Sequence, residues 1–310
     1  MTEPLDRKGL AFAIGAYGFW GFFPIFMDEL RPAGALEIVA HRALWSLAVC
    51  VLTIAVARRW RFLVAAFRDW RTVATLGLAA GFLAVNWGIF IYAVLSDRVA
   101  ESSFGYYINP LITVAFGVVL LGERLHRAQK VAIGLAGVAV IVIGIDVGGL
   151  PWIAPTLAIT FAIYALLKKR VGLKVDALTG LTIETFALAP FAVGLVWLLA
   201  SQGNSTWGGH GLGHDLWLAS TGLWTAGALI VFAAGAARLP LYVTGLIQYL
   251  TPTVTFILAV AYFHETMSCL RWAGFGLVWL ALVIISVDSW RRSRTSAELR
   301  IQAAKVPEVV

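Results

Sequence analysis

One apolar segment of the sequence carries three ionisable residues close together, namely Glu37, His41 and Arg42. In an α-helix, a spacing of four residues places the carboxylate of Glu37 and the imidazole of His41 on the same face. If the segment crosses a membrane, such groups are expected to face protein or a water-filled cavity, because lipid cannot hydrate them. The sequence therefore predicts a site that anchors a polar substrate group or relays protons. The alternative is a set that pairs internally or with neighbouring helices.

Arg42 is a candidate for binding an anionic substrate group, such as a carboxylate. A second acidic residue, Glu184, lies in a later apolar segment, where an internal shift of 142 positions aligns it with Arg42. The two residues are therefore a possible ion pair. Glu37, His41 and Glu184 are the candidates for proton coupling, because they are ionisable groups at predicted membrane depth.

Two further apolar segments each contain a proline near the middle, in the motifs YYINP at 106–110 and QYLTP at 248–252. A proline ring clashes with the carbonyl four residues earlier, so Pro110 and Pro252 are predicted to kink their helices. Backbone groups freed in this way are tolerated at membrane depth where they are buried in protein or line a wet cavity. The motifs thus predict a central cavity flanked by Tyr106, Asn109, Gln248 and Tyr249. The alternative is an ordinary packing kink repaired by a neighbouring side chain.

Three more residues are candidates for the same site. Asn86 is the only amide in its segment and is followed by Trp87, and Trp20 lies deep in the first segment. A buried Asn serves as a hydrogen-bonding ligand or joins helices, and the residue type does not separate the two uses. Trp20 and Trp87 are predicted to hold the apolar body of a substrate, whereas packing is the common role of a deep Trp.

The elements that carry these residues are predicted to be membrane-spanning helices. The chain has 310 residues, of which 60% are hydrophobic and 13% are charged. Soluble proteins average about 45–50% apolar and about 25% charged residues. Apolar stretches of about twenty residues, the length that crosses a bilayer, recur near 8–27, 34–57, 72–96, 99–121, 126–146, 150–168, 175–200, 214–236, 240–263 and 268–289.

The positive charges indicate how these ten segments cross the membrane. With the N-terminus inside, 20 of the 24 Lys and Arg residues fall in inner segments, three in outer segments, and Arg42 within a span. This is the bias of the positive-inside rule, and it predicts that both termini are cytoplasmic. It also explains the net charge of +7 without a nucleic-acid partner, because the basic residues are spread between apolar segments rather than gathered on one face.

The two halves of the chain resemble each other. Shifting the sequence by 142 positions lays the first five segments over the last five without a gap, and it matches Tyr107 with Tyr249 and Pro110 with Pro252. Because each half has five spans, the second half enters the membrane from the opposite side, which makes an inverted repeat. The predicted fold is an all-α integral membrane protein of ten helices, with five-helix repeats at 1–147 and 148–290 and a cytoplasmic tail at 291–310.

Several motifs together resemble a known family. They are EIVAHRALWS at 37–46, Asn86-Trp87, ESSFGYYINPL at 101–111, LGER at 121–124 and QYLTPT at 248–253. The chain resembles the drug/metabolite transporter superfamily with paired EamA-type halves, and within it the bacterial RarD branch. The resemblance covers nearly the whole chain and implies a ten-helix carrier of the inner membrane that exports small metabolites, with amino acids among the substrates of related members.

These observations predict a secondary transporter that works by alternating access around a mid-membrane cavity, with a small-molecule substrate and the lipid bilayer as its partners. An integral-membrane enzyme that uses Glu37 and His41 on a lipid-like substrate is an alternative, and a passive channel is another. No phosphate-binding loop, zinc-ligand spacing or nucleophile elbow occurs in the sequence, so we expect neither an enzyme nor a metal or cofactor. Substrate identity, proton coupling and oligomeric state stay open.

Overall fold

The computed structural model describes residues 6–121, 127–147, 151–171, 174–236, 238, 239, 243 and 247–303. In these residues the regular elements are helices, and none is a strand, as predicted for an all-α protein. The chain forms two compact units. Unit 1 comprises Met1–Asn109 and Trp152–Thr266, and unit 2 comprises Pro110–Pro151 and Met267–Val310. Glu123, which belongs to one of the family motifs, lies outside the described residues.

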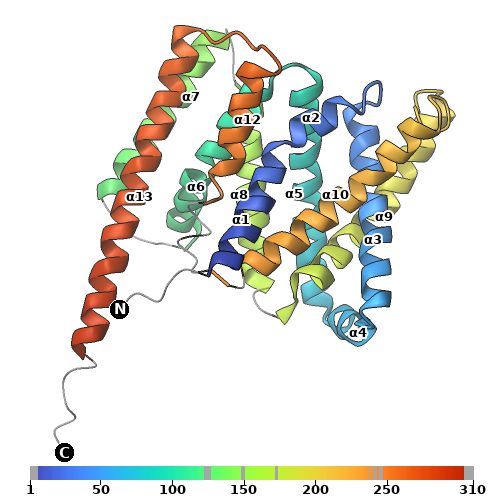
Figure 1. Cartoon of the computed structure of the whole chain (residues 1–310), viewed down its shortest axis with the longest axis horizontal. Helices are drawn as coiled ribbons and strands as arrows, with labels where there is room; N and C mark the ends of the chain where they lie inside the picture. Colours follow the sequence, from blue (N-terminus) through green and yellow to red (C-terminus); the bar gives the residue numbers. More distant parts are fainter. Residues whose placement is uncertain are drawn as a thin grey trace, which may run out of the picture. The chain divides into compact units, whose positions relative to one another are not determined.

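Unit 1 holds most of the helices and the contacts of the candidate site described below. The helix α3 (Ala35–Val56) packs against α9 (Ala177–Ser201) and α10 (Leu212–Ala236), and α5 (Trp70–Leu95) packs against α8 (Ile153–Val171). The remaining helices of the unit are α1 (Arg7–Gly21), α2 (Phe23–Asp28), α4 (Trp60–Arg68), the part of α6 (Val99–Leu121) before Pro110, and α12 (Leu250–Ala261). In Figure 1, α1 runs beside α10, and α4 lies at the end of α3.

Unit 2 contains the long helices α7 (Arg127–Val147) and α13 (Cys269–Ala303), which lie side by side (Figure 1). Their approach is close at Gly274, where an added Cβ would lie 2.6 Å from a side-chain carbon of Ile143. Near the C-terminal end of α7, Asp146 Oδ2 accepts a hydrogen bond from Arg271 Nε at 2.7 Å. A glycine contact and an ion pair therefore join the two helices.

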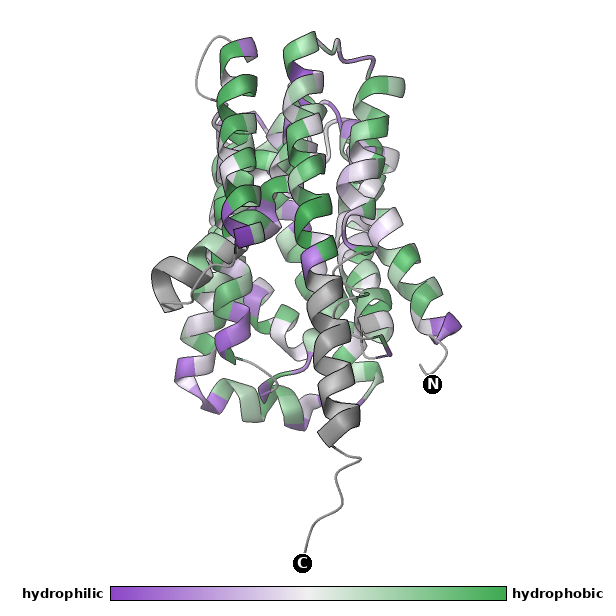
Figure 2. Cartoon of the chain, turned by 90° about the vertical axis from the view of Figure 1, so that its left-hand side faces the viewer, coloured by the Kyte–Doolittle hydropathy of each residue, from purple (hydrophilic) through white to green (hydrophobic). Residues whose placement is uncertain are grey.

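Six helices of the described chain are long and apolar enough to cross a membrane, namely α3, α5, α7, α9, α10 and α13. Figure 2 shows hydrophobic residues along most of the helix lengths and hydrophilic residues at several helix ends and turns. Large apolar side chains such as Phe191 and Trp197 are exposed on the helix surfaces. A surface of this kind is stable when lipid rather than water is the solvent, so the protein is a multi-pass membrane protein.

The first predicted segment, 8–27, forms two helices instead of one continuous span. α1 ends at Gly21, where the backbone N–H of Phe22 bonds to the carbonyls of Gly18 and Phe19. α2 then begins at Phe23, with Pro24 in its first turn. Pro24 has no N–H with which to continue the α1 hydrogen-bond ladder, and it is well tolerated in a first helical turn. The proline therefore explains the break.

A very close helix crossing in unit 1 joins α3 and α10. A Cβ added at Gly222 would lie 2.2 Å from the carbonyl carbon of Trp45, which is closer than any side chain allows. Gly222 thus lets the backbones of the two helices touch. Arg42 lies one turn before Trp45, and Thr225 lies one turn after Gly222, so this crossing brings the two residues together.

Candidate functional site

Arg42 is buried in unit 1, with 4% of its surface exposed. Its Nε donates a hydrogen bond to Thr225 Oγ1 on α10 at 2.9 Å. The guanidinium carbon lies 4.0 Å from the centroid of the Trp87 ring on α5 and 5.1 Å from that of Phe23 on α2. Residues of three other helices therefore fix the position of this cation.

The charge of Arg42 is not balanced by a carboxylate of any described residue. Among the ion pairs between described residues, none includes Arg42. Burying an ion costs several kcal/mol, and a cation–aromatic contact from which water is excluded returns about 2 kcal/mol or more. A guanidinium offers a planar fork of donors that fits a carboxylate or phosphate. The arrangement is therefore suited to bind an anion.

Asn86 is 1% exposed and connects three helices. Its Nδ2 donates to the carbonyl of Leu157 at 2.9 Å and to Thr160 Oγ1 at 3.0 Å, both on α8. Its Oδ1 accepts a hydrogen bond from the hydroxyl of Tyr106 on α6 at 3.0 Å. Both amide donors and one acceptor position are thus used within the protein. Of the two uses predicted for Asn86, these contacts are those of a helix-joining residue, and contact with a substrate stays a prediction.

Tyr106 connects Asn86 with the surroundings of Arg42. Its ring lies 5.9 Å from that of Phe90 and 6.3 Å from that of Phe161. The phenol is also within electrostatic range of the Arg42 guanidinium. Four residues of the predicted site therefore come together in unit 1, and we refer to them as the Arg42 cluster: Arg42, Asn86, Trp87 and Tyr106.

Glu37 makes different contacts. Its carboxylate accepts hydrogen bonds from the hydroxyl of Ser205 at 2.9 Å, and from the backbone N–H and hydroxyl of Thr206 at 2.7 and 3.0 Å. The backbone N–H of Trp207 adds a longer contact of 3.4 Å. Glu37 therefore fastens the segment that follows α9 to the first turn of α3. We call residues 205–207 the strap.

His41 also contacts the strap. Its ring stacks on that of Trp207, with 4.8 Å between centroids and 18° between planes. Both ring nitrogens are buried, and neither has a hydrogen-bond partner in the part of the chain that the structure describes. The structure thus groups Glu37 and His41 with the strap, as two residues that hold a connecting segment.

Glu184 has its own cation. Lys168 Nζ donates to Glu184 Oε1 at 2.5 Å, and the hydroxyl of Tyr164 lies 3.5 Å from Oε2. The sequence suggested an ion pair between Glu184 and Arg42, but these two described residues do not form it. The carboxylate of Glu184 pairs instead with Lys168, which lies in the last turn of α8. Alignment in an inverted repeat does not bring side chains into contact.

The remaining predicted residues lie elsewhere in the fold. Trp20 packs on Tyr17 and Phe232, at centroid distances of 5.5 and 5.6 Å. Asn109, Gln248 and Tyr249 are each half-buried. No described contact connects these four residues with Arg42, and their roles in binding stay predictions.

The two prolines differ in their positions. Pro110 lies inside α6, as expected for a kink. Pro252 instead lies in the first turn of α12, which begins at Leu250 after a turn at Gln248 and Tyr249. A first turn does not use the N–H that proline lacks, so the helix starts near Pro252 rather than bending there.

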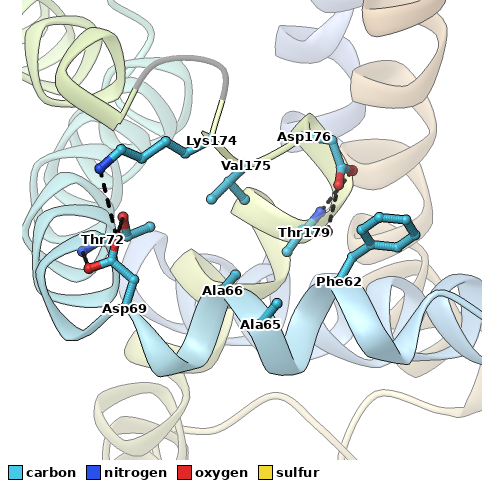
Figure 3. A pocket seen from close by; sticks show the side chains of 9 residues that line it. All are labelled: Phe62, Ala65, Ala66, Asp69, Thr72, Lys174, Val175, Asp176 and Thr179. Atoms are coloured by element: carbon cyan, nitrogen blue, oxygen red, sulfur yellow. Dashed lines mark hydrogen bonds and ion pairs between the residues drawn. The ribbon is translucent and has the colours of Figure 1, made fainter.

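A cavity of about 230 Å³ lies where α4 meets the first turns of α5 and α9, and Figure 3 shows the side chains around it. Asp69 and Asp176 cap these two helices, and each accepts a hydrogen bond of 2.8 Å from the threonine three residues later. The cavity is lined by Phe62, Ala65, Ala66, Asp69, Thr72, Lys174, Val175, Asp176 and Thr179.

Two ion pairs connect the elements around this cavity. Lys174 Nζ lies 3.8 Å from Asp69 Oδ2, and Arg59 lies 3.3 Å from Asp176 Oδ2. The hydrogen bonds from the hydroxyl and backbone N–H of Thr72 lower the pKa of the Asp69 carboxyl, and the charge of Lys174 adds to this effect. The helix α4 was not expected from the sequence, and these contacts show that it is part of the folded structure.

The family model that matches the chain is that of the EamA-like transporter family, and it matches twice, at residues 7–145 and 151–287. The chain belongs to this family. The transporter is 49% identical over 303 residues to "Protein RarD" of Streptomyces exfoliatus, which covers 98% of this chain and 95% of that protein. It is 35% identical to "Uncharacterized transporter YojE" of Bacillus subtilis, over 96% of this chain and all of that one. The predicted RarD branch is thereby confirmed.

A solved protein structure has the same fold. It aligns with a TM-score of 0.60 over 93% of this transporter and 99% of its own chain, at 18% sequence identity. At this level the similarity concerns the fold alone. Together with the relatives, it supports a membrane transporter of the EamA fold.

Sequence reasoning missed several residues that contact the predicted site of the transporter. Thr225, Phe23 and Trp207 hold Arg42 and His41, and Thr160 holds Asn86. A weak signal was available for Thr225, because it follows Gly222 by one helical turn, and glycines mark close crossings in membrane helices. Threonine and phenylalanine are otherwise common in apolar helices, so their types alone did not mark the other positions.

Proposed function

We propose that this chain is a secondary transporter that moves small organic metabolites, such as amino acids or amphipathic and aromatic compounds, by alternating access. The observation that carries the proposal is the buried Arg42, which lies over the ring of Trp87 and forms no ion pair with a carboxylate in the described part of the chain. A buried and uncompensated cation is costly for the fold alone. Its cost is understandable if a substrate group supplies the missing anion during transport.

We further propose the arrangement that the sequence predicted. Ten spans form two inverted five-helix repeats, at 1–147 and 148–290, with both termini in the cytoplasm and the chain in the bacterial inner membrane. The distribution of positive charges and the two successive matches of the family model support this arrangement. Transport then consists of rocking motions that expose the Arg42 cluster to one side at a time, and we take export as its direction.

In this proposal the residues have distinct tasks. Arg42 binds an anionic group, while Trp87 and Tyr106 border the substrate's apolar part. Asn86 holds Tyr106 in place by the hydrogen bond described above. Trp20, Asn109, Gln248 and Tyr249 line the path that opens during rocking. Glu37, His41 and Glu184 are the candidates for proton coupling, through a change in their contacts upon protonation.

The test is a counterflow measurement with purified protein in liposomes. Vesicles are loaded with unlabelled amino acids or amphipathic metabolites, and uptake of a labelled member of the same class is recorded. A carrier gives saturable uptake and a transient accumulation above equilibrium. Flux without saturation or counterflow would indicate a channel, and chemical conversion of the compounds would indicate an enzyme. Absence of flux for all classes, with protein of normal melting temperature, would contradict the proposal.

A further inference from the structure

The Arg42 site offers donors for an anion. The guanidinium carries five N–H groups, and the one on Nε is used by Thr225. The other N–H groups have no hydrogen-bond partner among the described residues. The guanidinium carbon lies over the rings of Trp87 and Phe23, so the N–H groups on the two terminal nitrogens are the donors that remain for a ligand.

Thr225 fixes the direction in which this edge points. Its Oγ1 accepts from Arg42 Nε at 2.9 Å and donates its own proton to the carbonyl of Thr221 at 2.8 Å. The hydroxyl proton is therefore engaged, and a lone pair is directed at Arg42. One turn before Thr225, Gly222 packs directly against the backbone of Trp45 on α3. This contact fixes the position of α10, so Thr225 has little freedom to move.

Trp224 precedes Thr225 on α10 and carries a second donor. Its Nε1 is buried and has no hydrogen-bond partner among the described residues. The indole stacks on Phe19 at 5.0 Å, and Phe19 contacts Phe23 at 5.3 Å, the ring next to Arg42. A continuous group of aromatic side chains thus extends from Arg42 to an unused N–H. An indole N–H only donates, so its expected ligand is an acceptor oxygen.

The described contacts of Arg42 include no carboxylate that could be the counter-charge of an ammonium group. Glu37 and Glu184 are strongly buried in unit 1, and Glu101 is half-buried. Each of the three makes its own contacts, although Glu101 Oε1 has no hydrogen-bond partner among the described residues. Glu37 accepts the hydrogen bonds of the strap. Glu184 is paired with Lys168, and Glu101 with Arg98, each at 2.5 Å. An amino acid bound at Arg42 would therefore bury its ammonium group without a counter-charge, which is strongly unfavourable.

We infer that the Arg42 site selects organic anions that carry no ammonium group, with Thr225 as a positioning residue for Arg42 and Trp224 as a second hydrogen-bond donor to the ligand. The inference rests on the proposed transport function, and it narrows the substrate class of that site. An aromatic or flat apolar body is favoured by the rings of Phe19, Phe23 and Trp224.

The substrate class is tested with four ligands of one size. Melting temperature in detergent is measured with increasing 3-phenylpropanoate, 3-phenylpropanamide, L-phenylalanine and 2-phenylethylamine. We expect the carboxylate without an ammonium group to stabilise the protein at concentrations about tenfold lower than the other three, since each tenfold in affinity corresponds to about 1.4 kcal/mol. Equal or stronger stabilisation by L-phenylalanine or by the amide would overturn the inference, as would no stabilisation by any of the four. The counterflow measurement decides the transport function separately.

The roles of Thr225 and Trp224 are tested by transport kinetics with 3-phenylpropanoate. Thr225→Val keeps the side-chain shape but removes the acceptor, and we expect the half-saturation concentration to rise about tenfold while the maximal rate changes less than about twofold. Thr225→Ser should restore affinity to within about threefold of the wild type. Trp224→Phe keeps the ring contacts and should raise the half-saturation concentration by about fivefold. A fall in maximal rate alone, or no rescue by serine, would show a structural role and contradict the assignment.

Discussion

Arg42 and Glu184 are two charged residues buried in the same unit, and the protein treats them differently. Glu184, 1% exposed, has Lys168 Nζ at 2.5 Å and the Tyr164 hydroxyl at 3.5 Å. Arg42, 4% exposed, has a threonine hydroxyl and two aromatic rings but no ion pair with a described carboxylate. The carboxylate is compensated within the fold, and the guanidinium is not.

The difference separates a charge that maintains the structure from one that is available for a ligand. Removing one member of a buried ion pair leaves an unpaired charge and destabilises the fold. Removing a cation that has no counter-ion takes away an electrostatic cost. Stability and transport should therefore respond in opposite ways to substitutions at the two positions, although both residues looked equally functional in the sequence.

The largest expected effect is the loss of transport in Arg42→Gln. We expect the ratio of maximal rate to half-saturation concentration to fall about 100-fold, because charged hydrogen bonds to the substrate are lost. The melting temperature should stay within about 3 °C of the wild type, since no ion pair is broken. The control is Arg61→Gln, which removes another arginine that lies over an aromatic ring, 4.8 Å from Phe62. Normal transport by Arg42→Gln would contradict the conclusion that the charge of Arg42 serves ligand binding.

The next effect is a loss of stability in Glu184→Gln. The substitution leaves Lys168 without its carboxylate, and we expect the free energy of unfolding to fall by about 2 kcal/mol, less than for a fully buried pair because Lys168 is 31% exposed. A double-mutant cycle with Lys168→Met measures the coupling between the two side chains by chemical denaturation in detergent. If Glu184→Gln kept its stability but abolished the pH dependence of transport, Glu184 would be a proton-coupling residue instead.

A smaller effect is expected at the strap. Glu37→Gln replaces an acceptor that receives three hydrogen bonds of 3.0 Å or less, so the strap should open more easily by about 1 kcal/mol. Hydrogen exchange of the backbone amides of residues 206 and 207 should become faster, while the melting temperature of the whole protein changes little. Ser205→Ala removes one of the donors and serves as a weaker reference. Unchanged exchange in Glu37→Gln would show that the carboxylate does not hold the strap.

The smallest effect concerns Asp69, the half-buried cap of α5. Hydrogen bonds from Thr72 lower its pKa in the folded protein, so the ionised form stabilises the fold above the unfolded pKa of about 3.9, and this contribution is lost as the pH falls through the folded pKa. Asn also caps helices but does not titrate in this range. The melting temperature of Asp69→Asn should therefore decline less than that of the wild type below about pH 4. Parallel declines would contradict the assignment.

Many residues of the candidate site were predictable from the sequence, but which of them contact one another was not. The spacing in the second segment identified Glu37, His41 and Arg42 as unusual for lipid, and all three are buried. Their contacts nevertheless diverge, because residues 37 and 41 share one helix face and lie against the strap, whereas residue 42 faces α10 and α5. Which neighbour each face meets depends on helix packing, which a single segment does not specify.

The sequence by itself determined the solvent and the class of this protein. Its apolar composition requires lipid around the helices, and its motifs identify the EamA-like family with the RarD branch. Only the tertiary structure decided that Glu184 pairs with Lys168, that Asn86 joins three helices, and that Arg42 has Thr225 but no carboxylate. The physical reason is that composition and periodicity report the environment of a segment, whereas the compensation of a buried charge depends on side chains brought close by helix crossings such as that at Gly222.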